Sequence, residues 1–309
     1  MKVRGSPLAV FGILILLGVA ACRPVPSPPA APAPPPKPPP PPAAAPAPAT
    51  FTIAVGIDLD TLDPVQMTTT TVVNMVEYIV ESLLVLNEEG KPQPKLAKSW
   101  TVTPDGLVYT FKLQEKVPFH DGTPFTAEAV KWAVERFLNP EVRNPLRARY
   151  RAVKGAEVVD PLTVKVNLSE PWPPFIGAMT WMGAGGVSPA SVDKEGNTFK
   201  NIVHPVGTGP YTFKERKKGE SFTVTRFKDY WGKKPFYDTV VFRIVPEAAT
   251  RESLLLAGQV DMIMLPPVAD IPALQKNPAV KVLAAPSNRT IVLAINNTKA
   301  PFTDARVRQ

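Results

Sequence analysis

The chain has 309 residues, of which 44% are hydrophobic and 20% are charged, enough for about two globular domains with sizeable cores. Its formal net charge of +8 comes from scattered basic residues, with no basic patch and no nucleic-acid-binding motif, which argues against a nucleic-acid partner. The single cysteine, Cys22, excludes an internal disulfide and a zinc site built from cysteines.

Residues 1–22 have the pattern of a bacterial lipoprotein signal peptide. Lys2 and Arg4 give a positive start, and the apolar run from Leu8 to Val19 is shorter than the ~20 residues of a membrane span. Small residues then stand directly before Cys22, as in a lipobox, in which the cysteine is lipidated and becomes the first residue of the mature protein. We therefore predict lipidation at Cys22. An ordinary signal peptide with a chance cysteine is the alternative.

Residues 23–50 consist almost entirely of proline and alanine. Such a tract cannot build a core and favours the polyproline II conformation. At ~3.1 Å per residue it reaches roughly 80 Å when fully extended. We interpret it as a stiff linker that holds the folded part away from the membrane. Binding of a partner module to the prolines is the alternative.

The folded part is predicted to begin at Phe51 and to mix strands with helices. Strands are indicated by alternating apolar residues between turn signals, at 51–55, 84–86, 108–113, 162–168, 211–213, 222–224, 240–244, 262–264, 280–283 and 290–295. Helical spacing of apolar residues indicates helices at 72–84, from Thr126 onward, from about Phe175, between Pro246 and Gly258, and at 269–276.

Several separated motifs occur in a fixed order. They are Leu62-Asp63-Pro64, the block 119–130 with Phe-His-Asp-Gly, the block 205–211 with Val-Gly-Thr-Gly-Pro-Tyr, Tyr230-Trp231-Gly232, and the run 296–309. In this order they resemble the extracytoplasmic solute-binding proteins of family 5, which serve peptide and nickel ABC importers. The resemblance spans 51–309 and implies an α/β fold with mixed sheets, two-lobed and periplasmic-binding-protein-like (type II).

The resemblance also implies a division of the chain and a function. Because the chain stops inside the last motif, lobe one is expected at 51–267 and only the start of lobe two at 268–309. The implied function is capture of an oligopeptide or similar small solute outside the cytoplasmic membrane, for delivery to ABC permease and ATPase subunits, without a cofactor. A peptide, a nickel chelate and an oligosaccharide all remain open as the solute. Localisation is expected at the periplasm or cell surface, through the lipid on Cys22.

The resemblance places the solute between the two lobes. We expect the loop after the first strand, with Met67, Thr68 and Thr69, and the segment with Trp181 and Met182, to contribute to its wall. Plain core packing is the alternative for each of these residues. In peptide-binding members, the acidic group that holds the peptide's amino terminus lies in lobe two, so it is not transferred to any residue here.

No catalytic or metal-binding arrangement is found. His120 and His204 are the only histidines and do not have metal-binding spacing, and we interpret His120-Asp121 as a turn that packs before a helix. The block 207–209, Gly-Thr-Gly, lacks the lysine of a phosphate loop. An enzyme, including a secreted hydrolase, is therefore not expected. The remaining alternative is a membrane-anchored surface lipoprotein that acts as a scaffold or adhesin, because a proline linker fits that role equally well.

Overall fold

A computed structural model describes residues 49–181, 185–285, 293 and 295–308. The predicted signal peptide with Cys22, nearly all of the proline-rich linker, Met182 and most of the predicted strand 290–295 lie outside these residues. Within the described ranges, no helix is both long enough and apolar enough to cross a membrane.

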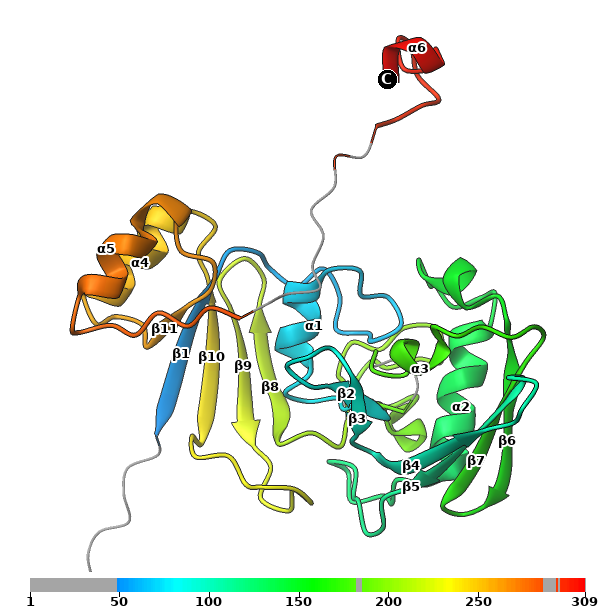
Figure 1. The fold of residues 1–309 in the computed structure, drawn as a ribbon. Helices are drawn as coiled ribbons and strands as arrows, with labels where there is room; N and C mark the ends of the chain where they lie inside the picture. The colour runs from blue at the N-terminus through cyan, green and yellow to red at the C-terminus, as the bar shows by residue number, and fades with distance from the viewer. Residues whose placement is uncertain (1–48, 182–184, 286–292, 294, 309) are drawn as a thin grey trace, which may run out of the picture. The chain divides into compact units, whose positions relative to one another are not determined.

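The larger sheet has five strands in the order β11-β1-β10-β9-β8 (Figure 1). They are β1 (Thr50–Val55), β8 (Tyr211–Lys217), β9 (Ser221–Arg226), β10 (Thr239–Ile244) and β11 (Met262–Ile263). β1 is parallel to β10 and β11, whereas β9 is antiparallel to both of its neighbours, β8 and β10. The predicted hairpin is confirmed, and Gly219 takes a φ of +77° in its turn, a conformation that favours glycine. The sheet is therefore mixed, as predicted.

The second sheet has four antiparallel strands in the order β4-β5-β7-β6. They are β4 (Ala97–Val102), β5 (Val108–Leu113), β6 (Val153–Asp160) and β7 (Thr163–Leu168), and a separate two-stranded sheet joins β2 (Leu84–Leu86) to β3 (Pro92–Pro94). Helix α2 (Ala127–Leu138) begins after Thr126, as predicted. It packs on β6 and β7 because Val130, Val134 and Phe137 are buried on one face. Val164, Val166 and Leu168 confirm the alternation predicted for β7, since all three are buried.

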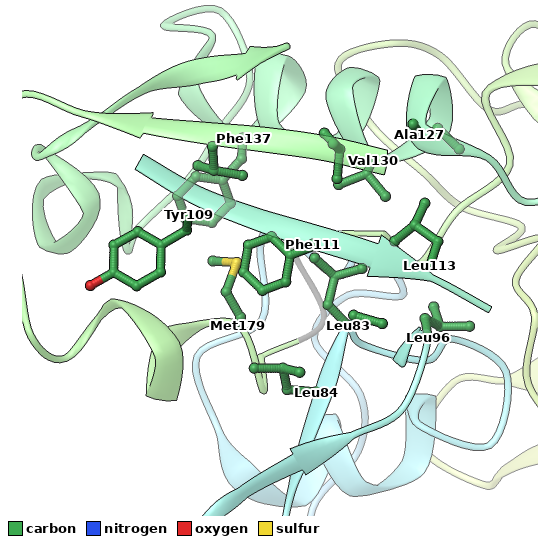
Figure 2. Packing of buried hydrophobic residues seen from close by; sticks show 14 of the residues in the cluster. Leu83, Leu84, Leu96, Tyr109, Phe111, Leu113, Ala127, Val130, Phe137 and Met179 are labelled. Carbon is green, nitrogen blue, oxygen red and sulfur yellow. The ribbon is translucent and has the colours of Figure 1, made fainter. Parts of the chain in front are cut away.

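One hydrophobic core joins the second sheet to α2 and to the segments around it. Figure 2 shows Phe111 of β5 among Leu83, Leu84 and Met179, and all four side chains are buried. A second core lies between the five-stranded sheet and α1 (Thr70–Val76), where Met75 and Val76 pack with residues of β9 and β10. Burial of apolar surface contributes ~25 cal/mol per Å², so these two cores supply most of the favourable free energy of folding.

The helix predicted over 72–84 is shorter than expected, because α1 ends at Val76. Its predicted apolar face is nevertheless buried through Leu84. Beyond Val76 the backbone is used for tertiary pairing: the Ile79 carbonyl accepts from Gly209 N–H and the Tyr78 carbonyl accepts from Tyr211 N–H, both at 2.9 Å. These bonds replace the helical ones, so the chain leaves the helix while its apolar residues stay in the core.

The C-terminal elements agree with the predictions in part. Helix α4 (Ala248–Leu256) ends before Gly258, which takes a φ of +66°, as a helix-terminating glycine does. The predicted helix 269–276 is divided into a 3₁₀ turn at Val268–Asp270 and α5 (Ile271–Lys276). The predicted strand 280–283 is wrong, because 279–285 is irregular and pairs with no described strand. Short helices α3 (Phe175–Ala178) and α6 (Ala305–Arg308), with 3₁₀ helices at Arg147–Tyr150 and Pro189–Ser191, complete the described elements.

Candidate functional site

The carboxyl ends of β1, β8, β10 and β11 lie at the same edge of the five-stranded sheet, since these four strands run in one direction. In open α/β sheets, ligands bind in the crevice outside the carboxyl ends of the strands. The loop 56–69 leaves β1 at this edge (Figure 1). This geometry makes the loop a candidate wall of a binding site.

The first part of the loop is fastened to the β8–β9 hairpin. The Asp58 carboxylate accepts a hydrogen bond from Gly219 N–H at 2.9 Å and pairs with Arg216 Nη2 at 3.3 Å. Arg216 also donates to the Leu59 carbonyl. Burial alone would raise the pKa of Asp58, but the Gly219 amide and the Arg216 guanidinium lower it below its ordinary value. The loop therefore carries a stable negative charge that fixes Arg216.

The second part of the loop is fastened to α2 by a buried ion pair. Asp63 is 0% exposed and Arg136 is 2% exposed. Arg136 donates to both carboxylate oxygens of Asp63, at 2.8 Å from Nη1, and its Nε donates to the Phe199 carbonyl at 2.7 Å. Asp63 also accepts from Ile202 N–H at 3.0 Å. The aspartate of the Leu-Asp-Pro motif thus joins three segments that are far apart in the sequence.

A crevice of about 280 Å³ lies between these fastened segments. Its wall is mostly polar and comes from the loop, from the segment after α2, from 201–203 and from β8. The lining residues are Asp60, Thr61, Leu62, Gln66, Thr68, Arg143, Pro145, Asn201, Ile202, Val203 and Arg216. Concave sites with a few convergent polar groups on a rigid support are the usual form of small-molecule sites.

Two of the other motif blocks, 205–211 and 230–232, meet at a buried carboxylate away from this crevice. Glu81, 5% exposed, pairs with Lys95 at 2.9 Å and accepts from the Tyr230 hydroxyl at 2.7 Å, Trp231 Nε1 at 2.8 Å and the Thr208 hydroxyl at 3.0 Å. Burial, and then the charge and hydrogen bond of Glu81, raise the pKa of Tyr230. All the acceptor capacity of Glu81 is used inside the fold, so this cluster is structural.

Glycine is required where the block 207–209 meets the turn after α1. A Cβ at Gly207 would lie 2.0 Å from the Ile79 carbonyl oxygen, and one at Gly209 would lie 2.6 Å from the Tyr78 carbonyl oxygen. His120 holds the same turn, with Nε2 at 2.9 Å from the Gly209 carbonyl and Nδ1 at 3.3 Å from Gly207 N–H. Burial lowers the pKa of His120 to about 4, so the ring is neutral near neutral pH. His120 therefore packs a turn, as predicted.

Arg251 fixes the same carboxyl edge of the sheet on the side of β11. Its side chain is 4% exposed, and the guanidinium donates to four backbone carbonyls at the ends of β10 and β11. The acceptors are Val245, Pro246, Met264 and Leu265, at 2.8–3.1 Å. Burial lowers the pKa of Arg251, against the charge of Glu247, which raises it. The buried arginine is thus explained by backbone carbonyls rather than by a ligand.

Comparison with known protein families identifies the family of this chain. The family model of bacterial extracellular solute-binding proteins, family 5 (middle part), matches residues 91–309. The chain belongs to this family. Its relatives are substrate-binding proteins of ABC transporters, not enzymes, in agreement with the sequence prediction.

Family 5 relatives match most of this chain but are longer. The glutathione-binding protein GsiB of Escherichia coli O1:K1 / APEC is 33% identical over 250 residues, which cover 81% of this chain and 48% of GsiB. The chain therefore spans about half the length of the curated relatives it matches.

Solved structures of two-lobed periplasmic binding proteins confirm the predicted fold class. The binding protein MoaA of A. tumefaciens R10, in complex with mannopinic acid, matches with a TM-score of 0.71 and 28% identity, over 85% of this chain and 54% of MoaA. DppA of Helicobacter pylori, in complex with the peptide STSA, matches with a TM-score of 0.67 and 27% identity, over 74% of this chain and 49% of DppA.

The predicted solute-contacting residues of this family 5 chain have different environments. Thr68 is exposed and lines the crevice, and Thr69 is exposed just before α1. Met67 is fully buried in the second core. Trp181 is half-buried and lines an apolar cavity of about 20 Å³, roughly the space of one water molecule, and Met182 lies outside the described residues. Among the four of these residues that the structure describes, Thr68 alone lines the crevice.

The sequence analysis did not identify the arginines of the crevice or the ion pairs Asp58–Arg216 and Asp63–Arg136 that hold its loop. One weak signal was present: Arg136 directly precedes Phe137, which belongs to the helix face that was predicted to be buried. A buried arginine requires an acceptor, and the Leu-Asp-Pro motif supplies an aspartate. Arg143 and Arg216 gave no such signal, since their lining role depends on how three segments fold together.

Proposed function

We propose that this chain forms the first lobe of a solute-binding protein of an ABC importer. In this proposal the protein captures a peptide or similar small solute outside the cytoplasmic membrane and delivers it to the permease. The observation that carries the proposal is the polar crevice at the carboxyl edge of the sheet, on a loop fastened by Asp63 and Asp58. Membership of family 5, a relative named for glutathione binding, and similar structures in complex with a peptide and with mannopinic acid support it.

The end of the five-stranded sheet supports the proposed lobe boundary. We place lobe one at 51–267 and the start of lobe two at 268–309. The last strand of the sheet in chain order, β11, ends at Ile263, and Leu265 then takes a φ of +54°, which is uncommon outside glycine. The Arg251 guanidinium binds the carbonyls on both sides of this point, which suits the fixed base of a hinge.

We also propose that Cys22 carries a lipid and that residues 23–50 act as the linker to the membrane. The linker would then enter the fold at β1, where Ala49 N–H donates to the Asp238 carboxylate at 3.1 Å. Metabolic labelling with a fatty acid is expected to mark the wild-type chain and not a Cys22→Ala variant. Labelling that persists in Cys22→Ala would refute the anchor and leave the import proposal untouched.

Thr68, Thr69, Trp181, Met182 and Met67 remain proposed contributors to the solute wall. Thr68 has the strongest support, because it already lines the crevice. Trp181 would need a neighbouring lobe to close over it, since its own cavity of about 20 Å³ is too small for a solute. Met67 would act by supporting the loop from the core.

The two-lobe proposal makes a prediction about affinity. Solute-binding lobes close around a ligand by a hinge motion, so one lobe supplies only part of the contacts. Isothermal calorimetry with di- to pentapeptides is expected to show affinity weaker than micromolar for residues 51–309. Micromolar binding would contradict the need for a second lobe. Neighbouring genes for a permease and an ATPase would favour import over the scaffold alternative.

A further inference from the structure

The loop between β9 and β10 contains an exposed turn, residues 233–237, with the sequence Lys-Lys-Pro-Phe-Tyr. Phe236 is 79% exposed, although phenylalanine is among the residue types that are most often buried. Lys233 and Lys234 are also exposed, and neither forms an ion pair with a described residue. The turn 233–237 therefore presents a large apolar side chain beside two uncompensated positive charges.

The backbone around Phe236 is fixed by contacts with the sheet. Arg226, at the end of β9, forms an ion pair with Asp238 and donates to the Phe236 carbonyl at 3.5 Å. The Tyr237 carbonyl accepts a hydrogen bond from the Tyr211 hydroxyl at 3.1 Å. Both neighbours of the Phe236 side chain in this direction are thus held by the fold, while the Phe236 ring itself points into solvent. The exposure of the ring is therefore a built feature of the turn.

The turn 233–237 lies where the proline-rich linker enters the fold, at the end of the sheet opposite the crevice. Ala49 N–H donates to the Asp238 carboxylate at 3.1 Å, and the Ala49 carbonyl accepts from Asp238 N–H at 2.9 Å. β10 and its parallel neighbour β1 both begin at this edge. Figure 1 shows the β9–β10 loop at this end of the strands and the loop 56–69 at the other. A surface that contacts the turn would therefore leave the crevice open.

We propose that the turn 233–237 docks the folded part of the chain on an anionic lipid membrane. Phe236 would enter the boundary between headgroups and acyl chains, and Lys233 and Lys234 would face the anionic headgroups. Aromatic side chains with neighbouring lysines are typical of segments that bind in the membrane interface. Each lysine near an anionic membrane surface strengthens binding about fivefold. This inference goes beyond the proposed import function and does not depend on a lipid at Cys22.

The composition of the loop favours a membrane over a protein partner. Residues 227–237 contain three lysines and one aspartate, so the loop carries a net charge of +2 that is complementary to anionic headgroups. Lysine is depleted in protein–protein interfaces relative to the rest of the protein surface. A single exposed aromatic ring flanked by lysines is thus better matched to a lipid interface than to the core of a protein interface.

The predicted linker 23–50 is compatible with this docking. Polyproline segments keep their direction over only several residues, so a linker of this length limits the distance between the fold and the membrane without fixing it. A lipid at Cys22 would raise the concentration of the turn near the membrane. In the docked state the crevice would face away from the membrane.

Vesicle co-sedimentation of the chain from Cys22 to Gln309, made without lipid, tests the inference. Vesicles of phosphatidylcholine with phosphatidylglycerol are compared with vesicles of phosphatidylcholine alone. Binding to the anionic vesicles is expected to be about tenfold tighter or more. A rise in salt from about 0.1 M to about 1 M shortens the screening length from about 10 Å to about 3 Å, so it should weaken this binding.

Variants of the turn assign the binding to the named side chains. Phe236→Ser should weaken binding to anionic vesicles about tenfold, because it removes the apolar side chain from the interface. Phe236→Trp should retain binding, because tryptophan also suits the membrane interface. Lys233→Gln combined with Lys234→Gln should weaken binding about 25-fold and reduce its salt dependence.

Two matched controls change similar side chains elsewhere. Val268→Ser changes an apolar side chain that is 81% exposed but lies outside the turn. Lys217→Gln combined with Lys218→Gln removes two exposed lysines at the opposite edge of the sheet, and so lowers the net charge by the same amount as the turn variant. Both controls should bind anionic vesicles like wild type. Thermal melts by circular dichroism show that all variants stay folded.

Four results would overturn the inference. They are equal binding to the two kinds of vesicle, wild-type binding by Phe236→Ser, equal losses in the two double-lysine variants, and no binding to anionic vesicles. The last result would leave a protein partner as the occupant of the turn. Solute uptake tests import and fatty-acid labelling tests the lipid anchor. Because the vesicle assay uses chain without lipid or solute, its failure is distinguishable from the failure of either proposal.

Discussion

The substitution Asp63→Asn tests how the crevice loop is held. The Asp63 carboxylate accepts from Arg136, from Ile202 N–H at 3.0 Å and from Val65 N–H at 3.1 Å. An asparagine of the same shape replaces one oxygen by an NH₂ group. Val65 N–H and one Arg136 donor share one oxygen, and Ile202 N–H and the other donor share the second, so either orientation leaves at least two donors unsatisfied.

The expected loss is large because Arg136 would become a buried charge without a counter-ion. Breaking a buried pair by changing one partner costs about 3–5 kcal/mol, a large part of the roughly 5–15 kcal/mol that stabilises a typical domain. Urea denaturation followed by tryptophan fluorescence and circular dichroism should show this loss for Asp63→Asn. The double variant Asp63→Asn with Arg136→Met should recover part of it, because the uncompensated charge is removed.

The control for this experiment is the exposed pair Arg151–Glu170. Its atoms are 3.7 Å apart and its side chains are 81% and 58% exposed, so Arg151→Gln should change stability by less than about 1 kcal/mol. A loss below about 1 kcal/mol for Asp63→Asn as well would show that the ion pair does not hold the loop. The crevice would then lack the rigid support that the Asp63–Arg136 pair is inferred to provide.

Two further substitutions test the turn between the cores. Gly207→Ala should lower the free energy of unfolding by about 3 kcal/mol or prevent folding, since its Cβ would lie 2.0 Å from the Ile79 carbonyl oxygen. The control Gly177→Ala, whose Cβ would have no atom within 4 Å, should change this free energy by less than about 1 kcal/mol. Equal losses for the two variants in urea denaturation would contradict the prediction. Burial depresses the folded-state pKa of His120 to about 4, so its neutral form stabilises the fold fully above about pH 6.5, and about 3 kcal/mol is lost as pH falls toward 4. The melting temperature of His120→Gln should therefore fall less than that of wild type over this pH range, and parallel curves would refute the assignment.

Elements with a strong local pattern were predictable from the sequence. The strict alternation in 162–168 identified β7, and the block after Thr126 identified α2, because in each case one face has to be buried against the same core. The end of α1 was not predictable in this way. Its residues continue a helical apolar pattern, and only the distant Gly209 and Tyr211, which bind the carbonyls of Ile79 and Tyr78, end the helix.

The candidate site was predictable in outline only. The loop after the first strand does line a crevice, through Thr68 and its neighbours. Met67 follows the turn that begins at Asp63 and is fully buried. Burial in this loop follows neither the helical nor the strand period, so the sequence pattern did not indicate that Met67 belongs to the core. Arg143 and Arg216 come from separate elements, and only the folded chain brings them to one crevice.

Thermal-shift binding on the full product of the gene tests the central claim most directly. The panel is amino acids, di- to pentapeptides, chelated nickel and oligosaccharides, with wild type beside Arg143→Gln. A solute that binds only the native state raises the melting temperature, and the rise grows with its concentration relative to Kd. We predict a rise with one class of solute in the panel, and a smaller rise in Arg143→Gln, which changes the wall of the crevice. No shift with any member of the panel would contradict the solute-binding function and favour an anchored scaffold.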